Sequence, residues 1–481
     1  MKYRLIVLIL ALACGGQCFS ASATRFRVDA NDNLRYQLDC LAGLIRCTRV
    51  ETALSQEISR NPVASEKLDA WRDTRQRQSG TTARATRSRS ALPPITDLVV
   101  NSGRETNGSR RLTQRRGEFD DPLEHQLLAY FSPAFQRDWQ DFGAQHVGNM
   151  RAQLRWLGVR EDVANALDRI AVFLHSDNIE TPVATLIALP DSGRGSIATL
   201  DADTIYLETP LGDSANNRLP VLAHEYVHFW LSHHAQRVSQ QLASAFADSD
   251  QPCSVVAFGI FEEAIASALG NGIIEQQLNS GAAFREYLAI PDSFYADRNI
   301  DAVAKAVLPD VIRYIADGKA LDDAFVAIFI DRTARTLGDR CASIALQMRT
   351  SAMVLSGPAL AEAGQLARQQ WRSATMFTDV STGSAGNTAL EHYHALPGAI
   401  LTTANALTDM HTLPDGLRLA LQRIAGVHRR FVYAWPRSNA ATVYVVVGDT
   451  EDATANTLVQ LLALRKQQFN GLWVPPALPG P

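Results

Sequence analysis

One segment near the middle of the chain carries residues suited to hydrolytic chemistry: His224, Glu225 and His228, in the order His-Glu-Tyr-Val-His. Two histidines four residues apart lie on one face of a helix, where both imidazoles can bind one Zn²⁺. Glu225 stands one step round the helix and can act as general base toward a metal-bound water. Only 11 of 481 residues are histidine, so this spacing rarely arises by chance, and it predicts one zinc ion per chain.

The residues around this motif predict the helix that positions it. Asn216 and Asn217 offer capping side chains, and Pro220 suits a first helical turn. Apolar residues surround the motif on nearly every side, which is typical of a helix buried in a core. Two histidines and a glutamate without partners would be costly there, and a shared metal removes that cost. The alternative is a helix whose histidines are only hydrogen-bonded in the interior.

A glutamate on a later helix is the favoured third ligand. The run Phe261–Gly270 is apolar and alanine-rich, and acidic residues seldom lie in such a helix unless they are paired or metal-bound. Glu263 is preferred over Glu262 because its face carries only small residues. These would let the two helices approach closely. Glu262 is kept as the alternative ligand.

His234 is the rival third ligand, since it stands where the pattern HExxHxxGxxH places its last histidine. A glycine in that pattern turns the chain away after the second histidine, whereas Leu231 occupies its place here. A helix that continues past Leu231 would rotate His234 away from the face of His224 and His228. His233 and His234 are therefore expected to form a polar helix end, where positive charge suits the helix dipole.

With these elements the chain resembles the gluzincin metallopeptidases, the zincins whose third ligand is a downstream glutamate. The resemblance rests on His224, Glu225 and His228, with Glu263–Ala266 as the family's ExxA-type element, and covers roughly residues 170–275. It implies an α+β fold: a zincin-like catalytic core with a small sheet before the active-site helix, and a mainly helical second lobe. It also implies peptidase activity.

The family pattern bears on two further positions. Thermolysin-like members have an aspartate four residues after the ligand glutamate that orients the first histidine, and Ser267 stands there in this chain. Many zincins stabilise the oxyanion with a tyrosine or histidine, and the densest downstream group is His392, Tyr393 and His394. This group follows a loop-like run, and loops often carry functional groups. The alternative is an ordinary surface loop.

Short strands are expected before the histidine helix. The predicted strands, separated by turn residues, are Ile170–Leu174, Val183–Leu189, Ser196–Leu200 and Thr204–Leu207. Zincins hold an extended peptide by backbone pairing along the edge strand of such a sheet. Either Ser196–Thr199 or Thr204–Leu207 would supply that edge, unless the sheet merely covers the helix.

The start of the chain predicts export. Lys2 and Arg4 precede the apolar run Leu5–Ala13, and Ala21–Ala23 offers an A-x-A cleavage site. Residues 1–23 are therefore expected to be a signal peptide of a periplasmic or secreted protein. That run is too short to span a bilayer and no later apolar run reaches the length needed, so we expect no membrane span.

Four cysteines remain after the signal peptide, an even number suited to an oxidising compartment. We predict the pair Cys40–Cys47 on sequence proximity and the pair Cys253–Cys341 by exclusion, out of the three pairings that four cysteines allow. None of the four shows C-x₂-C spacing, so zinc ligation by cysteine is not expected.

Composition divides the mature chain into three parts. Residues 24–71 are expected to be a small helical segment, and residues 72–118 an arginine-rich disordered linker. Residues 119–481 would form one large zincin-like metallopeptidase region with room for two lobes. Cleavage in the linker would make residues 24–116 a propeptide. The sequence leaves open whether such cleavage occurs.

The sequence thus predicts a secreted or periplasmic zinc-dependent hydrolase that cleaves a peptide or protein substrate through a metal-activated water. The alternative is a non-catalytic periplasmic metal-binding or scaffold protein with a degenerate zincin fold. The net charge of −4, with basic residues concentrated in the linker, gives no case for nucleic acid as a partner. Oligomeric state, substrate sequence and endo- or exopeptidase action are left open.

Overall fold

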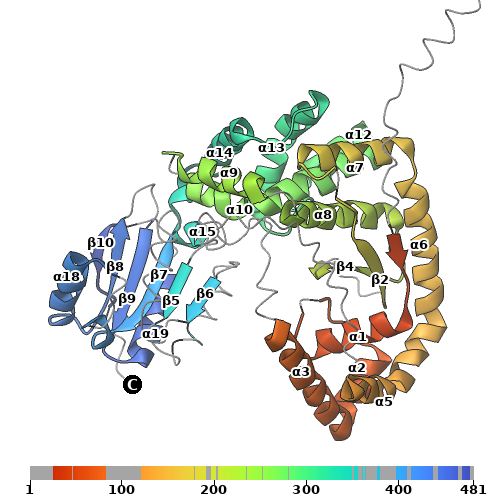
Figure 1. Ribbon diagram of the computed structural model, residues 1–481, viewed down its shortest axis with the longest axis horizontal. Helices are drawn as coiled ribbons and strands as arrows, with labels where there is room; N and C mark the ends of the chain where they lie inside the picture. The colour runs from red at the N-terminus through yellow and green to blue at the C-terminus, as the bar shows by residue number, and fades with distance from the viewer. Residues whose placement is uncertain are drawn as a thin grey trace, which may run out of the picture.

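The fold is mixed α+β, with two sheets and an extensive helical layer (Figure 1). The computed structural model describes residues 25–45, 47–82, 121–348 apart from 178, 191–196, 202–203, 234–235, 252 and 280, and then 352–355, 360, 363, 376–379, 397–408, 413–436, 442–463 and 469–476. In Figure 1, helices α7, α8, α9, α10, α12, α13 and α14 lie on one side of the first sheet and helices α1, α2, α3 and α5 on the other.

The first sheet has four strands in the order β1-β2-β4-β3. Strands β1, β2 and β4 are parallel, and β3 pairs antiparallel with β4 at one edge. Their bounds are β1 Arg25–Arg27, β2 Val183–Leu189, β3 Ala198–Asp201 and β4 Thr204–Pro210. Strand β2 is apolar and almost wholly buried, as expected of a parallel strand covered on both faces. Of the two candidate edges, β3 lies at an edge of the sheet and β4 lies inside it, so the alternative edge Thr204–Leu207 is wrong.

The predicted strand Ile170–Leu174 is also wrong. Nearly all of this segment belongs to helix α7, Glu161–Phe173. Buried residues of α7 recur at helical spacing through Val163, Ala166 and Ile170, and a short apolar run by itself cannot distinguish a strand from a buried helix. The fourth strand comes instead from β1, which is too short and too polar to stand out in the sequence.

The N-terminal helices pack against the first sheet. Their bounds are α1 Ala30–Leu41, α2 Ala53–Arg60, α3 Pro62–Thr82, α5 Pro122–Asp138, the π-helix η2 Trp139–Gly143 and α6 Ala144–Gly158. The Asn33 side chain on α1 donates to the Leu186 carbonyl at 2.9 Å and accepts from the Ala188 N–H at 2.7 Å, both on β2. These bonds attach α1 to β2, and β1 pairs with the same strand, so the N-terminal segment belongs to the same folded unit as the first sheet.

The predicted start of the linker at residue 72 needs correction, because α3 continues to Thr82. Its middle is held by polar contacts with α1. Arg75 pairs with the Asp39 carboxylate at 3.0 Å, and Trp71 Nε1 donates to the same carboxylate at 2.9 Å. Paired arginines on a helix look the same in the sequence as arginines in a solvated linker. Residues 83–118 lie outside the described residues.

A helical layer follows the first sheet and contains the largest hydrophobic core. Its helices are α8 Ala215–His233, α9 Gln236–Ala247, α10 Ser254–Ala266, the π-helix η3 Ser267–Ile274, α11 Glu275–Leu278, α12 Ala282–Ala289, α13 Arg298–Ala316, α14 Asp323–Leu337, the 3₁₀ helix η4 Gly338–Ala342 and α15 Ile344–Gln347. This part agrees with the expected helical lobe.

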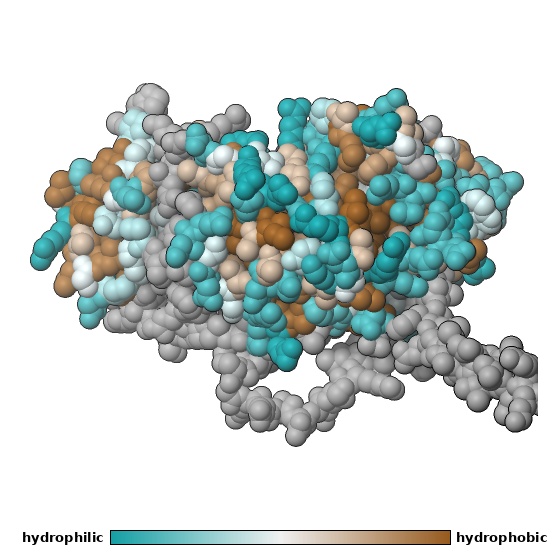
Figure 2. All heavy atoms as spheres, turned by 90° about the horizontal axis from the view of Figure 1, so that it is seen from above, coloured by the Kyte–Doolittle hydropathy of each residue, from teal (hydrophilic) through white to brown (hydrophobic). Residues whose placement is uncertain are grey.

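One helical stretch corrects the expectation that no later segment is long and apolar enough to cross a membrane. The continuous helix Ser254–Leu278, formed by α10, η3 and α11, meets that test by length and composition. Of its most apolar window, 72% is buried inside the protein, so it is accounted for as a core helix. On the face seen in Figure 2, apolar residues form separate patches between hydrophilic ones.

The chain then forms a second sheet, so the lobe after the histidine helix is not helical throughout. Its six strands have the order β10-β8-β9-β7-β5-β6. The bounds are β5 Ala352–Leu355, β6 Met376–Asp379, β7 Gly398–Thr403, β8 Arg430–Pro436, β9 Thr442–Gly448 and β10 Gly471–Trp473, with helices η6 Ala406–Thr408, α18 Asp415–Ala425 and α19 Glu451–Ala463. Strand β9 alternates its side chains between two cores: Val445 packs with Leu421 of α18, and Tyr444 with Leu458 of α19. The two helices therefore cover opposite faces.

Both predicted disulfides are confirmed. Cys40 pairs with Cys47, and Cys253 with Cys341. Cys253 is the N-cap residue of α10 and Cys341 lies in η4, so the second disulfide ties the start of the glutamate-bearing helix to the segment after α14. Two disulfides fit an oxidising compartment.

Candidate metal centre

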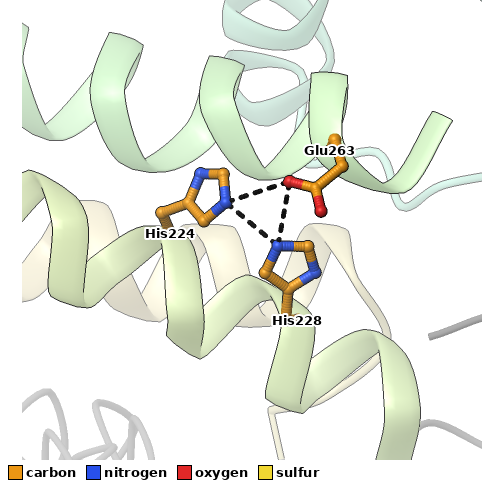
Figure 3. A group of neighbouring side chains, drawn as sticks. All are labelled: His224, His228 and Glu263. Carbon is orange, nitrogen blue, oxygen red and sulfur yellow. Dashed lines mark hydrogen bonds and ion pairs between the residues drawn. The ribbon is translucent and has the colours of Figure 1, made fainter. Parts of the chain in front are cut away.

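Three predicted ligands come together where α8 faces α10 (Figure 3). Nε2 of His224 lies 3.0 Å from Nε2 of His228, and Oε2 of Glu263 lies 3.4 Å from each nitrogen. Tetrahedral ligands at zinc distances of about 2.0–2.1 Å would lie about 3.3 Å apart. The three donor atoms therefore form a triangle of the size that one ion requires.

Helix α8 begins slightly earlier than predicted, which corrects the capping residues. Ser214 Oγ accepts the Asn217 N–H at 3.3 Å, and the Asn217 side chain donates to Asp213 Oδ1 at 2.9 Å. Asn216 and Asn217 thus lie within the helix, and Asn217 braces its first turn from inside. Serine is as good an N-cap as asparagine, so the capping preference alone does not distinguish a helix start at Ser214 from one at Asn216 or Asn217.

At its other end α8 continues through Leu231 to His233 without the turn that the HExxHxxGxxH pattern needs. Nδ1 of His233 lies 2.8 Å from the Phe229 carbonyl oxygen. This imidazole therefore caps a carbonyl near the helix end, as expected of a polar terminus. His234 lies outside the described residues.

A close contact between α8 and η3 explains how Glu263 reaches the histidines. A Cβ atom built on Gly270 would lie 2.5 Å from the backbone nitrogen of His224 and 2.7 Å from its Cα. Only glycine fits at such a distance. The small-residue face predicted around Glu263 is confirmed, and it permits the approach of the two helices.

Replacing Gly270 by alanine should therefore destabilise the protein and weaken metal binding together. The added methyl group must push η3 away from His224, at a cost of about 1–3 kcal/mol in unfolding free energy. Gly148→Ala on α6 is the matched control, because nothing lies within 4 Å of its added Cβ, and alanine favours a helix over glycine by up to about 1 kcal/mol. Thermal unfolding and zinc titration of both variants test this. Equal behaviour of the two would contradict the packing account.

The charges of the site depend on one another. Burial lowers the pKa of His228, but the Glu263 and Glu262 carboxylates outweigh burial and hold this pKa well above its ordinary value. Burial likewise raises the pKa of Glu263, but positive charge on His228 and a hydrogen bond from His224 hold it well below its ordinary value. In the metal-free protein, the raised pKa favours a second ring proton on His228, and a metal ion bound at Nε2 would displace it.

This proton gives the metal-free protein a distinct pH dependence. The unfolded chain releases it near pH 6.5, so the stability it contributes is complete below about pH 6.5 and lost as pH rises through the raised folded pKa of His228. The lowered pKa of Glu263 adds stability above about pH 4.5 that is lost as pH falls. Zinc-loaded protein lacks this second proton and keeps only the one on Nδ1 of His228, so it should show no such loss above pH 6.5.

The gap in unfolding free energy between zinc-loaded and metal-free protein should therefore widen with pH above about 6.5. The slope is at most about 1.4 kcal/mol per pH unit while His228 stays protonated. Thermal unfolding at pH 6.5, 7.5 and 8.5, with zinc and with chelator, measures it. A gap that stays constant over this range would show that zinc displaces no proton.

Glu225 follows His224 on α8 and is half-buried. Within the described residues its carboxylate takes part in no hydrogen bond or ion pair. The side chain is therefore not committed to a structural role in that part of the chain.

Two expected contributions to the site are not found. Ser267 is fully buried, but neither its Oγ nor Nδ1 of His224 has a hydrogen-bond partner among the described residues. The hydroxyl therefore does not replace the aspartate of thermolysin-like members. His392, Tyr393 and His394 lie outside the described residues, so their role stays a prediction.

Two residues beside the histidines were not assigned their observed contacts from the sequence. Oε1 of Glu262 lies 2.7 Å from Nδ1 of His228, on the side of the ring opposite Glu263. The Tyr295 ring stacks on the His224 ring, with centroids 6.0 Å apart and an interplanar angle of 19°. Two adjacent glutamates in an apolar helix could have indicated the contact between Glu262 and His228. Tyr295 follows Phe294, whose carbonyl accepts from Asn271 of η3, and no local pattern indicates that long-range placement.

Comparisons with protein-family models, curated proteins and solved structures find no match for this chain. The function is therefore argued from the residues of the site and the elements around them.

Proposed function

We propose that this protein is an exported zinc metallopeptidase in which His224, His228 and Glu263 hold the metal and Glu225 is the general base. The observation that carries the proposal is the triangle of two imidazole nitrogens and one carboxylate oxygen, 3.0–3.4 Å apart, with Glu225 following His224 on the same helix. Two histidines and a glutamate form a known catalytic zinc set. The donors suit zinc better than Mg²⁺ or Ca²⁺, which prefer oxygen ligands.

The number of ligands favours catalysis over a structural role. Structural zinc sites are closed by four protein ligands, whereas catalytic sites use three and keep one position open. The described part of the chain places His224, His228 and Glu263 in one group, with no fourth histidine, cysteine, aspartate or glutamate in it. When bound, zinc would lower the pKa of a water and polarise the scissile carbonyl.

Glu225 supplies the base that this chemistry needs. It would take the proton of the attacking water and pass it to the leaving amine. Its position next to His224 on α8 would bring the carboxylate near the metal without making it a ligand, and its partial exposure leaves it accessible. We assign it the role of general base for these reasons.

Strand β3 is the proposed binding strand for the substrate backbone. It lies at the edge of the first sheet, runs antiparallel to β4 and contacts helix α8. An extended peptide can add to a free strand edge through main-chain hydrogen bonds, which select for extended backbone rather than for particular side chains. The substrate class is therefore a peptide or an unfolded protein segment.

Hydrolysis of a mixed-sequence peptide library tests the proposal. Protein starting at residue 24 should cleave peptides, lose activity when a chelator removes the metal, and recover it when zinc is restored. Mass spectrometry of the fragments identifies the bond that is broken. A folded, zinc-loaded protein that leaves the library intact would contradict the proposed function.

A further inference from the structure

We infer that Glu262 is a positioning residue of this metal centre, which fixes His228 so that its Nε2 faces the ion. The inference rests on the proposed metal site and adds a residue to it. Oε1 of Glu262 lies 2.7 Å from Nδ1 of His228, and the side chains are 21% and 12% exposed. A contact this short and this shielded from water suits a charge-assisted hydrogen bond.

The hydrogen bond from His228 to Glu262 determines which ring nitrogen of His228 is free to bind a metal. A metal binds the lone pair of one ring nitrogen, and in neutral histidine the other nitrogen then carries the proton. An ionised carboxylate can only accept, so Glu262 retains that proton on Nδ1. The Nε2 lone pair is then directed toward Nε2 of His224 and Oε2 of Glu263, 3.0 and 3.4 Å away.

Helix geometry lets the two adjacent glutamates contact different nitrogens of the His228 ring. Successive residues of an α-helix point about 100° apart, so neighbours can approach one ring from different sides. Glu263 faces Nε2 of His228 and Glu262 faces Nδ1. The imidazole is thus held at both nitrogens by consecutive residues of α10, and a rotation of the ring would break both contacts.

The other histidine is held differently, which makes Glu262 individually important. Nδ1 of His224 is buried and has no hydrogen-bond partner among the described residues. Its ring is instead packed against Tyr295, and the backbone of His224 lies close to Gly270. In the described part of the site, Glu262 is therefore the carboxylate that fixes a ligand tautomer.

Zinc titration of Glu262→Ala and Glu262→Gln tests the inference, with Glu286→Ala on the exposed face of α12 as control. Loss of an orienting partner of this kind costs about 10–100-fold in metal affinity, and we expect that loss for Glu262→Ala. Glutamine can still accept the Nδ1–H bond through its amide oxygen, so it should recover most of the affinity. Glu286→Ala should bind zinc as the unmodified protein does.

The absorption spectrum of the cobalt-substituted protein gives a second measurement that needs no activity. Glu262→Ala should shift the visible cobalt bands, because the His228 ring changes its orientation, whereas Glu262→Gln should nearly reproduce the original spectrum. Unchanged affinity and spectrum in Glu262→Ala, or equal loss in both variants, would overturn the positioning role while leaving the metal site intact. Failure of the unmodified protein to bind zinc would overturn the metal site and this inference together. If Glu262→Ala does not fold, the glutamine variant still decides: a large loss of affinity there contradicts the inference.

Discussion

Replacing Glu225 by glutamine is expected to abolish peptide hydrolysis while zinc still binds. Glutamine has nearly the same size but cannot accept a proton, and a general base contributes about 10²–10⁴-fold to rate. Because the Glu225 carboxylate bonds to no described residue, its loss should leave the fold and the three ligands in place. The turnover number of the purified variant, measured with its zinc content, checks this.

The control for this variant is Glu286→Gln, which removes an equivalent charge from an exposed position on α12. It should keep full activity and full zinc content. Retained turnover in Glu225→Gln would remove Glu225 from the mechanism. Loss of both zinc and turnover would mean that Glu225 acts on the metal site itself rather than as a base.

Replacing Glu263 by alanine should remove most of the zinc affinity. Its carboxylate is the one oxygen donor in the triangle and the main negative charge beside His228. Loss of a direct ligand should exceed the 10–100-fold effect of an outer partner, so we expect a fall of at least about a hundredfold. Zinc titration of the folded variant gives the dissociation constant.

His234→Ala is the informative comparison for this prediction. Helix α8 continues through Leu231 to His233 without the turn that the HExxHxxGxxH pattern needs. His234→Ala should therefore keep the zinc affinity of the unmodified protein. The opposite ranking of the two variants would favour the third ligand of the HExxHxxGxxH pattern.

The metal triangle could be predicted because short-range rules determine most of it. The spacing of His224 and His228 fixes their common face, and the small residues after Glu263 indicate where another helix can approach. Gly270 bears this out, since its hydrogen occupies space that no side chain could share with His224. Disulfide pairing followed from sequence proximity and from the small number of cysteines.

Features that depend on long-range contacts could not be predicted. Strand β1 has three residues and is a strand only because β2 lies beside it. Arg75 resembles a linker arginine until Asp39 of α1 pairs with it. Tyr295 reaches His224 from a segment 71 positions later in the chain, 295 minus 224, and periodicity carries no information over that separation.

Helical facing predicted only part of what the adjacent glutamates Glu262 and Glu263 do. Helical facing separates Glu262 from Glu263 and identifies the better ligand, but it does not show what the other residue contacts. The structure places Glu262 on the far nitrogen of the same histidine. Both glutamates therefore contact His228, Glu263 at Nε2 and Glu262 at Nδ1.

The most direct test of the proposed metal centre is the zinc content of protein prepared from residue 24 onward and purified without chelators or metal-affinity resin. We expect about one zinc ion per chain, bound by His224, His228 and Glu263. A folded sample that contains no zinc, and takes up none when zinc is offered, would contradict the metal site and favour a non-catalytic scaffold protein.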